Sequence, residues 1–445
     1  MKTKILLQIL LSFALLTPSM IHGENRRVII TTDIGGTDPD DEQSMVHLLM
    51  MSNNIDIEGM ICQMAFMKSP IGIGTLTKII DAYEKVYPNL IIHDNRYPTA
   101  KYLRSIATTG QTEVGMSGVG KDYDTPGSDL IIKVVDKDDD RPIWLTAWGG
   151  MNTIAQAIWK VKNSRSEDEF NKFITKIRIY DILGQCDAGA WIAKNFPEIL
   201  YIRSTGVYGW APSDEFLANN IQKHGAMGAV YPKRRWATEG DSPSFLYLVD
   251  NGLNLPEVID AGGWGGRFDT KKAVSLRGMD WVKRNNLDES KYDPYEMHTN
   301  TKEGSAAISL WKEDIENDFA ARIQWSVSES YTKANHHPLI SIGKVKKPST
   351  SPIIKRVKAG ATVNFDASKS YDPDKDSLSY QWIFYKEASS YKNDIAFSGQ
   401  GKAKCSITIP IEAAGSRIYV ILKVKDNGTP SLSSYRRIII DVTTK

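Results

Sequence analysis

Three aspartates near the start of the chain have a spacing that could do chemistry. Asp33 follows a β-branched run, and Asp40 and Asp41 come after a turn that contains glycine and proline. Carboxylates that converge on one point repel each other, so such a cluster needs a cation or protons for neutralisation. A hard divalent metal is the natural partner. The alternative is that Asp40 and Asp41 cap a helix, where carboxylates accept orphan N–H groups.

A strand, a loop and a helix must position these aspartates. Residues 28–32 predict the strand and residues 42–51 the helix. Further strands are predicted at 55–66, 142–148, 174–183 and 199–206, with helices at 73–87, 128–135, 151–163 and 187–196 between them. This alternation predicts an α/β fold with a mostly parallel sheet flanked by helices. Ligands of such sheets bind at the carboxyl ends of the strands, where the aspartates fall.

The strand followed by D-x-x-x-x-x-x-D-D resembles the N-terminal signature of the nucleoside hydrolases. Thr31 stands where these enzymes usually have an aspartate, and the loop between Asp33 and Asp40 is longer. Both features, with the later stretches EGDSPSFLYL and GGWGGRF, are more similar to a secreted nucleoside-hydrolase-like family whose members are often labelled cellulose-binding proteins. The resemblance covers residues 26–340 and implies a nucleoside-hydrolase-like fold.

The resemblance also implies a calcium site. Its ligands would be Asp33, Asp41, Asp241 and the backbone carbonyl of Trp148. Asp33 would in addition take the proton of the attacking water, and Asp40 would bind the sugar. Asp318 competes with Asp241 as the late ligand, but its place on an amphipathic helix favours an ion pair with Arg322.

Substrate-binding residues follow from the same resemblance. They are Asp40, Asn152, Gln185, Asp187, Trp191, His224, Glu239 and Trp264. Gln185 stands for an amide that relatives use on ribose, whereas Trp191 replaces a glutamate and Ala193 an asparagine. Gly240 replaces the histidine that protonates the leaving base, and the candidate substitutes are His224 and Glu239. Asp187 and Trp191 suit a different sugar, and Trp264 would wall the sugar site.

The first residues, MKTKILLQILLSFALLTPSMIHG, are typical of a secretory signal peptide, so we expect an exported protein, periplasmic or extracellular, cleaved near Gly23. No later stretch is long enough to predict a membrane span. Lys+Arg number 55 and Asp+Glu 53, a balance that does not favour nucleic acid as a partner. The cysteines, Cys62, Cys186 and Cys405, are widely spaced, and buried free thiols are expected.

The last hundred residues or so have a different pattern, with short strands and turns such as DPDKD and DNGTP, which predict a β-sandwich. DASKSYDPDKDSLSYQW resembles polycystic-kidney-disease or cadherin-like Ig modules. Asp372, Asp374 and Asp376 either bind calcium or form a polar turn. The predicted organisation is a signal peptide (1–23), an α/β domain (24–343) that folds alone, a linker (344–358) and an Ig-like sandwich (359–445).

Two functions are compatible with these features. The first is calcium-dependent hydrolysis of a glycosidic bond, N-ribosyl bonds included, through an oxocarbenium-like transition state. The second is non-catalytic binding of cellulose or another glycan on the same fold. The expected partner is a small sugar-containing substrate or a glycan. The sequence is also compatible with a homo-oligomer.

The departures at Trp191, Ala193 and Gly240 predict poor turnover of ordinary nucleosides. Each lost hydrogen bond to a hydroxyl or base costs about 1–3 kcal/mol if the substrate is unchanged. Incubation with inosine or uridine, followed by chromatography of the released base, should show weak turnover or none. Efficient hydrolysis of either nucleoside would mean that other residues restore the lost contacts.

Overall fold

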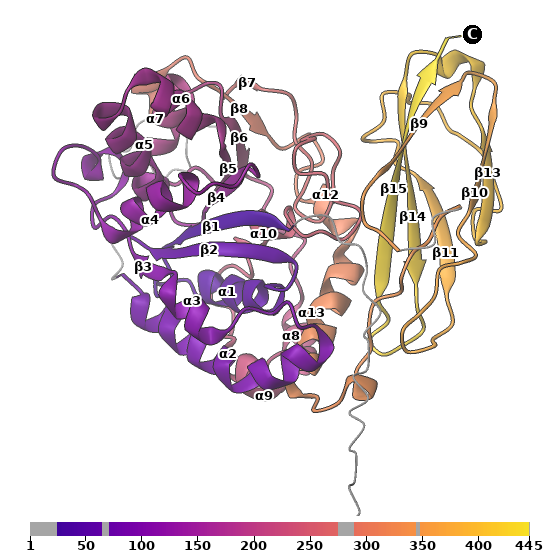
Figure 1. Cartoon of the computed structure of the whole chain (residues 1–445), viewed down its shortest axis with the longest axis horizontal. Coiled ribbons are helices and arrows are strands. Elements are labelled where there is room, and N and C mark those ends of the chain that lie inside the picture. The colour runs from indigo at the N-terminus through magenta and orange to yellow at the C-terminus, as the bar shows by residue number, and fades with distance from the viewer. Residues whose placement is uncertain (1–24, 65–70, 275–288, 344–347, 445) are drawn as a thin grey trace, which may run out of the picture.

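The computed structural model describes residues 25–64, 71–274, 289–343 and 348–444. A large α/β domain lies beside a C-terminal β domain (Figure 1). The predicted signal peptide, residues 1–23, and its cleavage near Gly23 lie outside the described residues. Within the ranges described, no helix is both long and apolar enough to cross a membrane.

The α/β domain is built on an eight-stranded sheet in the order β3-β2-β1-β4-β5-β6-β8-β7. The strands are β1 (Arg26–Thr32), β2 (Ile55–Cys62), β3 (Ala107–Thr109), β4 (Ile143–Ala147), β5 (Ile177–Ile182), β6 (Leu200–Ser204), β7 (Lys272–Ala273) and β8 (Glu296–Thr299). All neighbours pair in parallel except β7 and β8. The predicted mostly parallel sheet is confirmed.

Helices cover both faces of this sheet, as a parallel sheet requires. They are α1 (Asp40–Met50), α2 (Ile73–His93), α3 (Ala100–Ser105), α4 (Pro126–Val135), α5 (Asn152–Ser164), α6 (Glu167–Thr175), α7 (Ala188–Asn195), α8 (Asp214–Asn220), α9 (Gly225–Val230), α10 (Ser242–Leu246), α12 (Ala306–Ser309) and α13 (Lys312–Val327). Successive residues of β1 point to opposite faces, so Val28 and Ile30 join one hydrophobic cluster and Ile29 joins the other.

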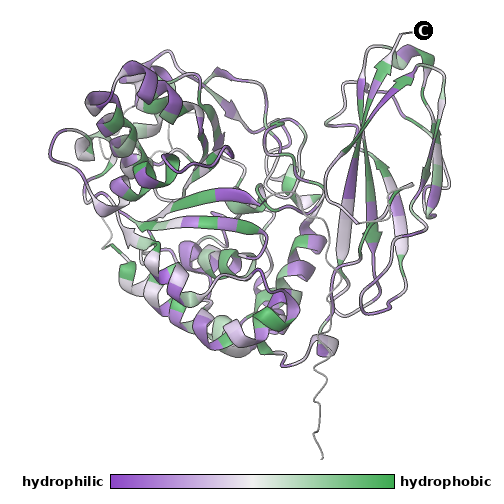
Figure 2. Cartoon of the chain, viewed as in Figure 1, coloured by the Kyte–Doolittle hydropathy of each residue, from purple (hydrophilic) through white to green (hydrophobic). Residues whose placement is uncertain are grey.

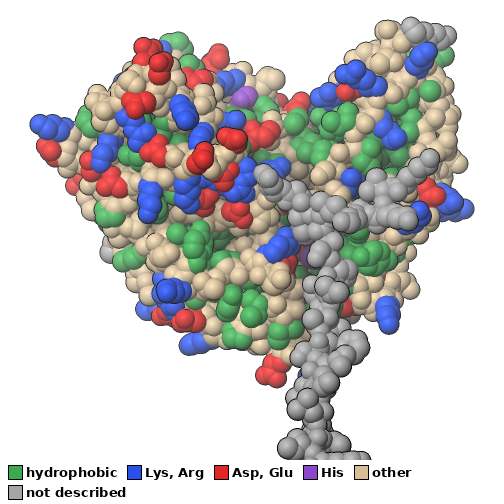
Figure 3. Space-filling model, viewed as in Figure 1, with side chains coloured by type: hydrophobic (Ala, Val, Ile, Leu, Met, Phe, Trp, Pro, Cys, Tyr) green, Lys and Arg blue, Asp and Glu red, His purple; other side chains and the backbone are tan. Residues whose placement is uncertain are grey.

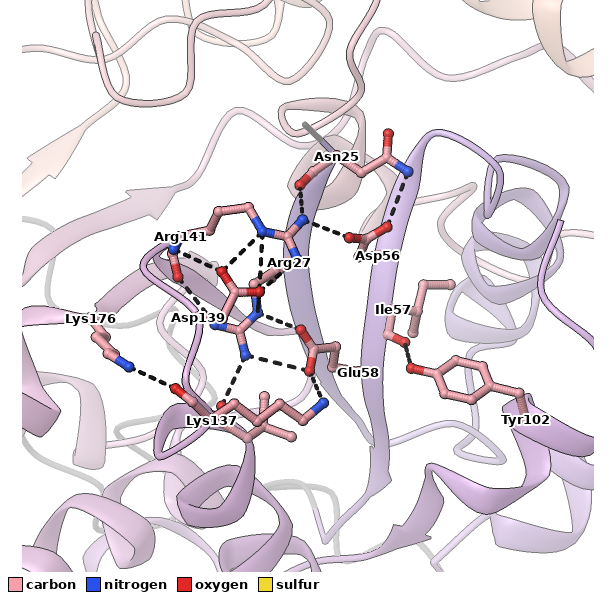
Figure 4. Close-up of polar contacts among 11 residues, drawn as sticks. Asn25, Arg27, Asp56, Ile57, Glu58, Tyr102, Lys137, Asp139, Arg141 and Lys176 are labelled. Carbon is pink, nitrogen blue, oxygen red and sulfur yellow. Dashed lines mark hydrogen bonds and ion pairs between the residues drawn. The ribbon is translucent and has the colours of Figure 1, made fainter. Parts of the chain in front are cut away.

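A buried charge network fixes the amino end of the sheet (Figure 4). Arg27 of β1 is completely buried and pairs with Glu58 of β2. Its guanidinium also donates to the carbonyls of Val134, at 2.9 Å, and Arg141, at 3.1 Å. Because β1 and β2 run in the same direction, this network leaves their carboxyl ends free for the aspartates at the opposite edge.

The C-terminal domain is a sandwich of two sheets, which confirms the predicted fold. One sheet contains β10 (Thr362–Asp366), β13 (Lys404–Thr408) and β12 (Phe397–Ser398), and the other β11 (Ser379–Phe384), β14 (Arg417–Lys425), β15 (Ser433–Thr443) and β9 (Ile353–Lys358). Figure 2 shows hydrophobic and hydrophilic residues mixed along these strands. Side chains of β9 alternate between half-buried and exposed positions, as expected for a strand with one covered face.

The structure corrects the bounds of the predicted linker and agrees with the polar turn and the buried free thiols that the sequence indicated. Residues 353–358 are not linker but strand β9, which pairs in parallel with β15 and so satisfies its backbone; residues 344–347 lie outside the described part. Asp372 accepts the backbone N–H groups of Asp374, at 2.8 Å, and Asp376, at 3.2 Å, as a polar turn does. The three cysteines are buried and free.

The two domains share one hydrophobic cluster, contrary to the expectation that residues 24–343 fold alone. Trp311 separates α12 from α13, and its ring packs edge-on against Tyr385, at 6.0 Å, and Tyr435, at 5.5 Å. Arg437 of β15 crosses the boundary and donates to the backbone carbonyls of Leu253, Ala261 and Gly262 at 2.7–2.9 Å. The sandwich therefore completes the core of the α/β domain.

On the face shown in Figure 3, basic and acidic side chains are interspersed over both domains. This distribution agrees with the near balance of 55 Lys+Arg and 53 Asp+Glu in the sequence. A surface with mixed charges attracts neither polyanions nor polycations through its overall field. On this face, electrostatic attraction of a ligand therefore depends on local groups rather than on the overall charge.

Arg437→Ala should strongly destabilise the whole chain. It leaves buried carbonyls without their donor, a loss of about 3 kcal/mol in the free energy of unfolding. Arg417→Ala is the matched control, because Arg417 lies on the adjacent strand in an exposed pair with Asp441 at 2.7 Å, worth about 0–1 kcal/mol. Urea unfolding of both variants tests this, and equal effects would contradict the role of Arg437 at the domain boundary.

Candidate functional site

An acidic cavity of about 220 Å³ opens at the carboxyl ends of the central strands. The loops after β1, β4, β5 and β6 and the segment before α10 contribute its walls. Its polar and aromatic walls include Asp33, Asp38, Asp40, Asp41, Asp241, Trp148, Gln185, Tyr208 and Trp236. This is the edge of the sheet where the parallel topology predicts a ligand site.

Asp40, Asp41 and Asp241 form a tight group, in which each offers a carboxylate oxygen within 4.8 Å of the others. Asp40 and Asp41 begin α1, and Asp241 directly precedes α10, which packs against α1. The Thr32 hydroxyl donates to Asp41. The Oδ2 atom of Asp241 is buried without a hydrogen-bond partner in the described structure. Three oxygen donors with an unpaired acceptor fit a cation.

The alternative that the aspartates merely cap α1 finds no support in the helix geometry. Pro39 holds the N-cap position, and no side-chain capping bond is made there. Asp40 and Asp41 lie instead within the first turn. Their carboxylates still favour the positive end of the helix dipole, but they lie together with Asp241 at the cavity.

Asp33 lies beside this group. A methyl group added to Gly149 would lie 2.2 Å from its Oδ1 atom, so only glycine lets the carboxylate approach the strand-to-helix turn. The sequence assigned Asp33 to the metal and Asp40 to the sugar, whereas the structure groups Asp40 with Asp41 and Asp241. The physical reason is that Asp40 and Asp41 lie together in one helical turn that packs against the α10 start.

Burial and mutual repulsion raise the pKa values of these carboxyl groups. Burial raises the pKa of Asp33 to about 6, with a further contribution from Asp38. Burial and then the charges of Asp38 and Asp33 raise the pKa of Asp40 to about 8. The pKa values of Asp41 and Asp241 also lie well above the usual range, first through burial and then through neighbouring carboxylates. Without a cation, protons must neutralise the site.

Trp148 and Gln185 meet at the cavity wall. The Gln185 amide donates to the Trp148 carbonyl, and the Trp148 indole donates to the Ser244 hydroxyl at 2.8 Å. The carbonyl that the resemblance assigns to a metal thus already has one donor. A carbonyl oxygen has two lone pairs, so one direction is left.

Asn152 and Asp187, predicted to contact substrate, lie outside the cavity wall and hold loops together. The Asn152 amide donates to the Glu113 carbonyl at 2.8 Å. Asp187 accepts the Met116 N–H at 2.9 Å and pairs with Lys291 at 2.5 Å. Both follow strands, as the sequence indicated, but they point to the neighbouring loops.

Trp191 and Trp264, which were predicted to contact the substrate, also lie outside the cavity wall. Trp191 packs edge-on against Phe196, with ring centroids 5.4 Å apart. Trp264 is buried at the domain boundary, where its ring meets Tyr435 at 6.2 Å. The prediction that Trp264 walls a sugar site is therefore wrong, because the GGWGGRF loop packs against the sandwich, which the sequence had treated as independent.

His224 and Glu239, the proposed substitutes for the leaving-group histidine, do not line the cavity. The His224 ring lies 3.1 Å from the Asn219 carbonyl. Glu239 is completely buried, 2.7 Å from both the His47 ring nitrogen and the Tyr231 hydroxyl. These contacts give Glu239 a structural role under the loop that carries Asp241.

Asp318 lies away from the acidic cavity and forms the predicted ion pair with Arg322, at 2.6 Å. His337 also contacts its carboxylate, at 2.8 Å. Burial opposes ionisation of Asp318, but Arg322 and His337 hold its pKa below the usual range. Asp241 is thus the late carboxylate of the site.

The place of the missing histidine is occupied. A side chain at Gly240 would begin 2.8 Å from Asp40 Oδ2 and 3.0 Å from the ring of Tyr208. Tyr208 and Trp236 both line the cavity and were not predicted, although both stand in loops at the expected edge. The sequence offered one indication of their role, because each aromatic residue stands in a segment that contains polar residues and glycine. Tyr208 stands in STGVYGW at the end of β6, and Trp236 stands in WATEGD before α10.

The parallel sheet and the carboxylates at its carboxyl edge define a nucleoside-hydrolase-like α/β protein with an appended β-sandwich. The model of the family described as "Cellulose-binding Sde182, nucleoside hydrolase-like domain" matches residues 27–268. That of "Cellulose-binding protein Sde0182, C-terminal domain" matches residues 362–442. The chain belongs to the Sde182 nucleoside-hydrolase-like family.

A solved structure from Saccharophagus degradans resembles the chain over nearly its whole length. It is described as a nucleoside hydrolase-related hypothetical protein associated with carbohydrate metabolism, and it is 48% identical with a TM-score of 0.89, covering 94% of this chain and 100% of its own. The PKD domain from KIAA 1837 protein matches at 18% identity, with 21% and 83% coverage and a TM-score of 0.17. None of the curated proteins matches the chain.

The raised pKa values predict an unusual pH dependence in chelator. The folded metal-free state binds protons more tightly than the unfolded state, so this stabilisation is complete below about pH 4. It is lost as the pH rises through about 6 for Asp33 and about 8 for Asp40. The melting temperature in EGTA should therefore fall from pH 5 to pH 9.

Asp41→Asn should flatten this fall, because an amide keeps the Thr32 bond but carries no charge. Asp394→Asn is the control, since Asp394 is 93% exposed in the sandwich. Calorimetric scans across the pH range measure the effect. A wild-type melting temperature that rises from pH 5 to pH 9 would contradict the carboxylate repulsion.

Proposed function

We propose that the chain is a calcium-dependent hydrolase that cleaves a glycosidic bond in a carbohydrate. The observation that carries the proposal is the convergence of Asp40, Asp41 and Asp241 within 4.8 Å at a cavity. The printed descriptions of the matching family and of the Saccharophagus degradans structure, cellulose binding and carbohydrate metabolism, support a carbohydrate as substrate.

Calcium suits the donor set better than zinc. Carboxylate and carbonyl oxygens are the ligands of hard cations, and calcium accepts six to eight of them, water included. Asp40, Asp41 and Asp241 would hold the ion, with the remaining lone pair of the Trp148 carbonyl nearby. When bound, the ion would supply positive charge that neutralises the carboxylates and attracts hydroxyls and water.

Residues of the chain itself carry out the other parts of the proposed hydrolysis. Asp33, fixed against Gly149, accepts the proton of the attacking water. Tyr208 lies against Asp40 at the position of the missing histidine, gives its proton to the leaving oxygen as the glycosidic bond breaks, and regains a proton from solvent. Gln185 holds the Trp148 backbone in place. The substrate is not an ordinary ribonucleoside, since Trp191 packs elsewhere and residue 240 has no side chain.

A second candidate function is carbohydrate binding without catalysis. Although Tyr208 is 43% exposed, desolvation at its hydroxyl and then the charge of Asp40 raise its pKa, so the hydroxyl keeps its proton and is a weak acid. His224 and Glu239 do not line the cavity, so neither can protonate the leaving group. Release of reducing sugar decides between the two functions.

Calcium should raise the melting temperature of the wild type by several degrees at pH 7, and EGTA should reverse the gain. A ligand present at a hundred times its Kd stabilises the folded state by about 2.7 kcal/mol. Asp41→Asn should lose this response, whereas Asp394→Asn should keep it. No response in the wild type, or an equal response in Asp41→Asn, would contradict the metal site.

Hydrolysis is tested with the wild type and with Asp33→Asn. Cello-oligosaccharides and other plant or microbial glycans are incubated with calcium or EGTA, and new reducing ends are measured. Asp33→Asn should reduce turnover by at least a hundredfold, as expected for loss of a general base, while its response to calcium persists. Binding without turnover in the wild type would favour the non-catalytic function.

A further inference from the structure

A second hollow of about 440 Å³ adjoins the acidic cavity. The loop after β6 and the segment before α10 form it. It shares Asp38, Tyr208 and Trp236 with the acidic cavity, so these three residues stand at the junction of the two hollows. A ligand that fills one hollow can therefore extend into the other.

Two aromatic rings at this junction are open to solvent. Trp236 is 60% exposed and Tyr208 43% exposed. The Arg235 guanidinium stacks over the Trp236 ring at 4.2 Å and also donates to the Thr37 carbonyl at 3.1 Å, so the indole is held before any ligand arrives. Exposed aromatic rings held in place are costly to leave in water and are typical of binding surfaces.

The arginines around the second hollow are already engaged. Arg234 pairs with Asp214 at 2.8 Å, and Arg235 covers Trp236. Asp38 accepts the Ala237 N–H at 3.1 Å through Oδ2, and its buried Oδ1 has no hydrogen-bond partner among the described residues. Such a wall favours a neutral ligand with an apolar face and hydroxyl edges, which describes a sugar ring, over an anion that would need a free cation.

The volumes of the two hollows indicate how many sugar rings the ligand has. The acidic cavity alone, at about 220 Å³, is smaller than the roughly 300–1,000 Å³ of ordinary ligand pockets. With the adjoining hollow of about 440 Å³, the site reaches that range. A ligand that uses the whole site therefore has at least a second ring.

We propose that Trp236 and Tyr208 form a second sugar subsite and that the substrate is a neutral oligosaccharide spanning both hollows. One ring presents its hydroxyls to the carboxylates, and the next ring stacks on Trp236. Tyr208 lies at the linkage between them. This inference rests on the proposed function, because it requires a sugar in the acidic cavity.

The test measures binding of glucose and of sulfur-linked, uncleavable cellobiose and cellotriose to the full chain in calcium by titration calorimetry. The wild type should bind cellotriose at least tenfold more tightly than glucose, or about 1.4 kcal/mol. Trp236→Ala should remove this gain, so that cellotriose binds no more tightly than glucose does to the same variant, and should leave the melting temperature unchanged. Trp236→Phe should keep most of the gain, because it retains a ring.

Trp191→Ala is the matched control and should change neither affinity, since Trp191 packs on Phe196 outside both hollows. A gain that survives Trp236→Ala, or no gain with length in the wild type, would overturn the second subsite. Asp41→Asn separates the two proposals, because it should weaken all three sugars. If it leaves glucose binding unchanged, the proposed function fails at the acidic cavity even where Trp236 still matters.

Discussion

Repulsion among buried carboxylates is the constraint on which the site depends. Asp40, Asp41 and Asp241 come within 4.8 Å of one another, with Asp33 beside them. Removing such charges from water is expensive unless an opposite charge or protons compensate. The fold must therefore hold the group in place by other interactions, and the same repulsion is the basis of the proposed cation site.

The interactions that hold the carboxylates in place lie at the amino ends of the strands and at the domain boundary. Arg27 and Glu58 fix the amino ends of β1 and β2, so the carboxyl ends are positioned without help from the site itself. Arg437 joins the sandwich to the carbonyls of the 253–262 segment, which follows α10 closely in the chain. The sandwich thus stabilises the part of the α/β domain that presents Asp241.

The residues that shape the cavity beyond its carboxylates lie in loops rather than in the sheet. Gly240 removes a side chain from the edge of the site, and Tyr208 occupies the space. Trp236 extends the surface away from the carboxylates. Tyr208 and Trp236 line both the acidic cavity and the adjoining hollow, while Asp40, Asp41 and Asp241 lie at the start of α1 and before α10.

The sequence by itself determined the α/β class, the parallel sheet, the sandwich and the edge that carries the aspartates. These depend on hydrophobic periodicity and on short motifs, which are local. Tertiary structure decided that Asp40 joins Asp41 and Asp241, that Trp264 belongs to the domain boundary, and that Tyr208 and Trp236 line the cavity. Such contacts join residues far apart in the chain, and their distances follow from packing that no local pattern encodes.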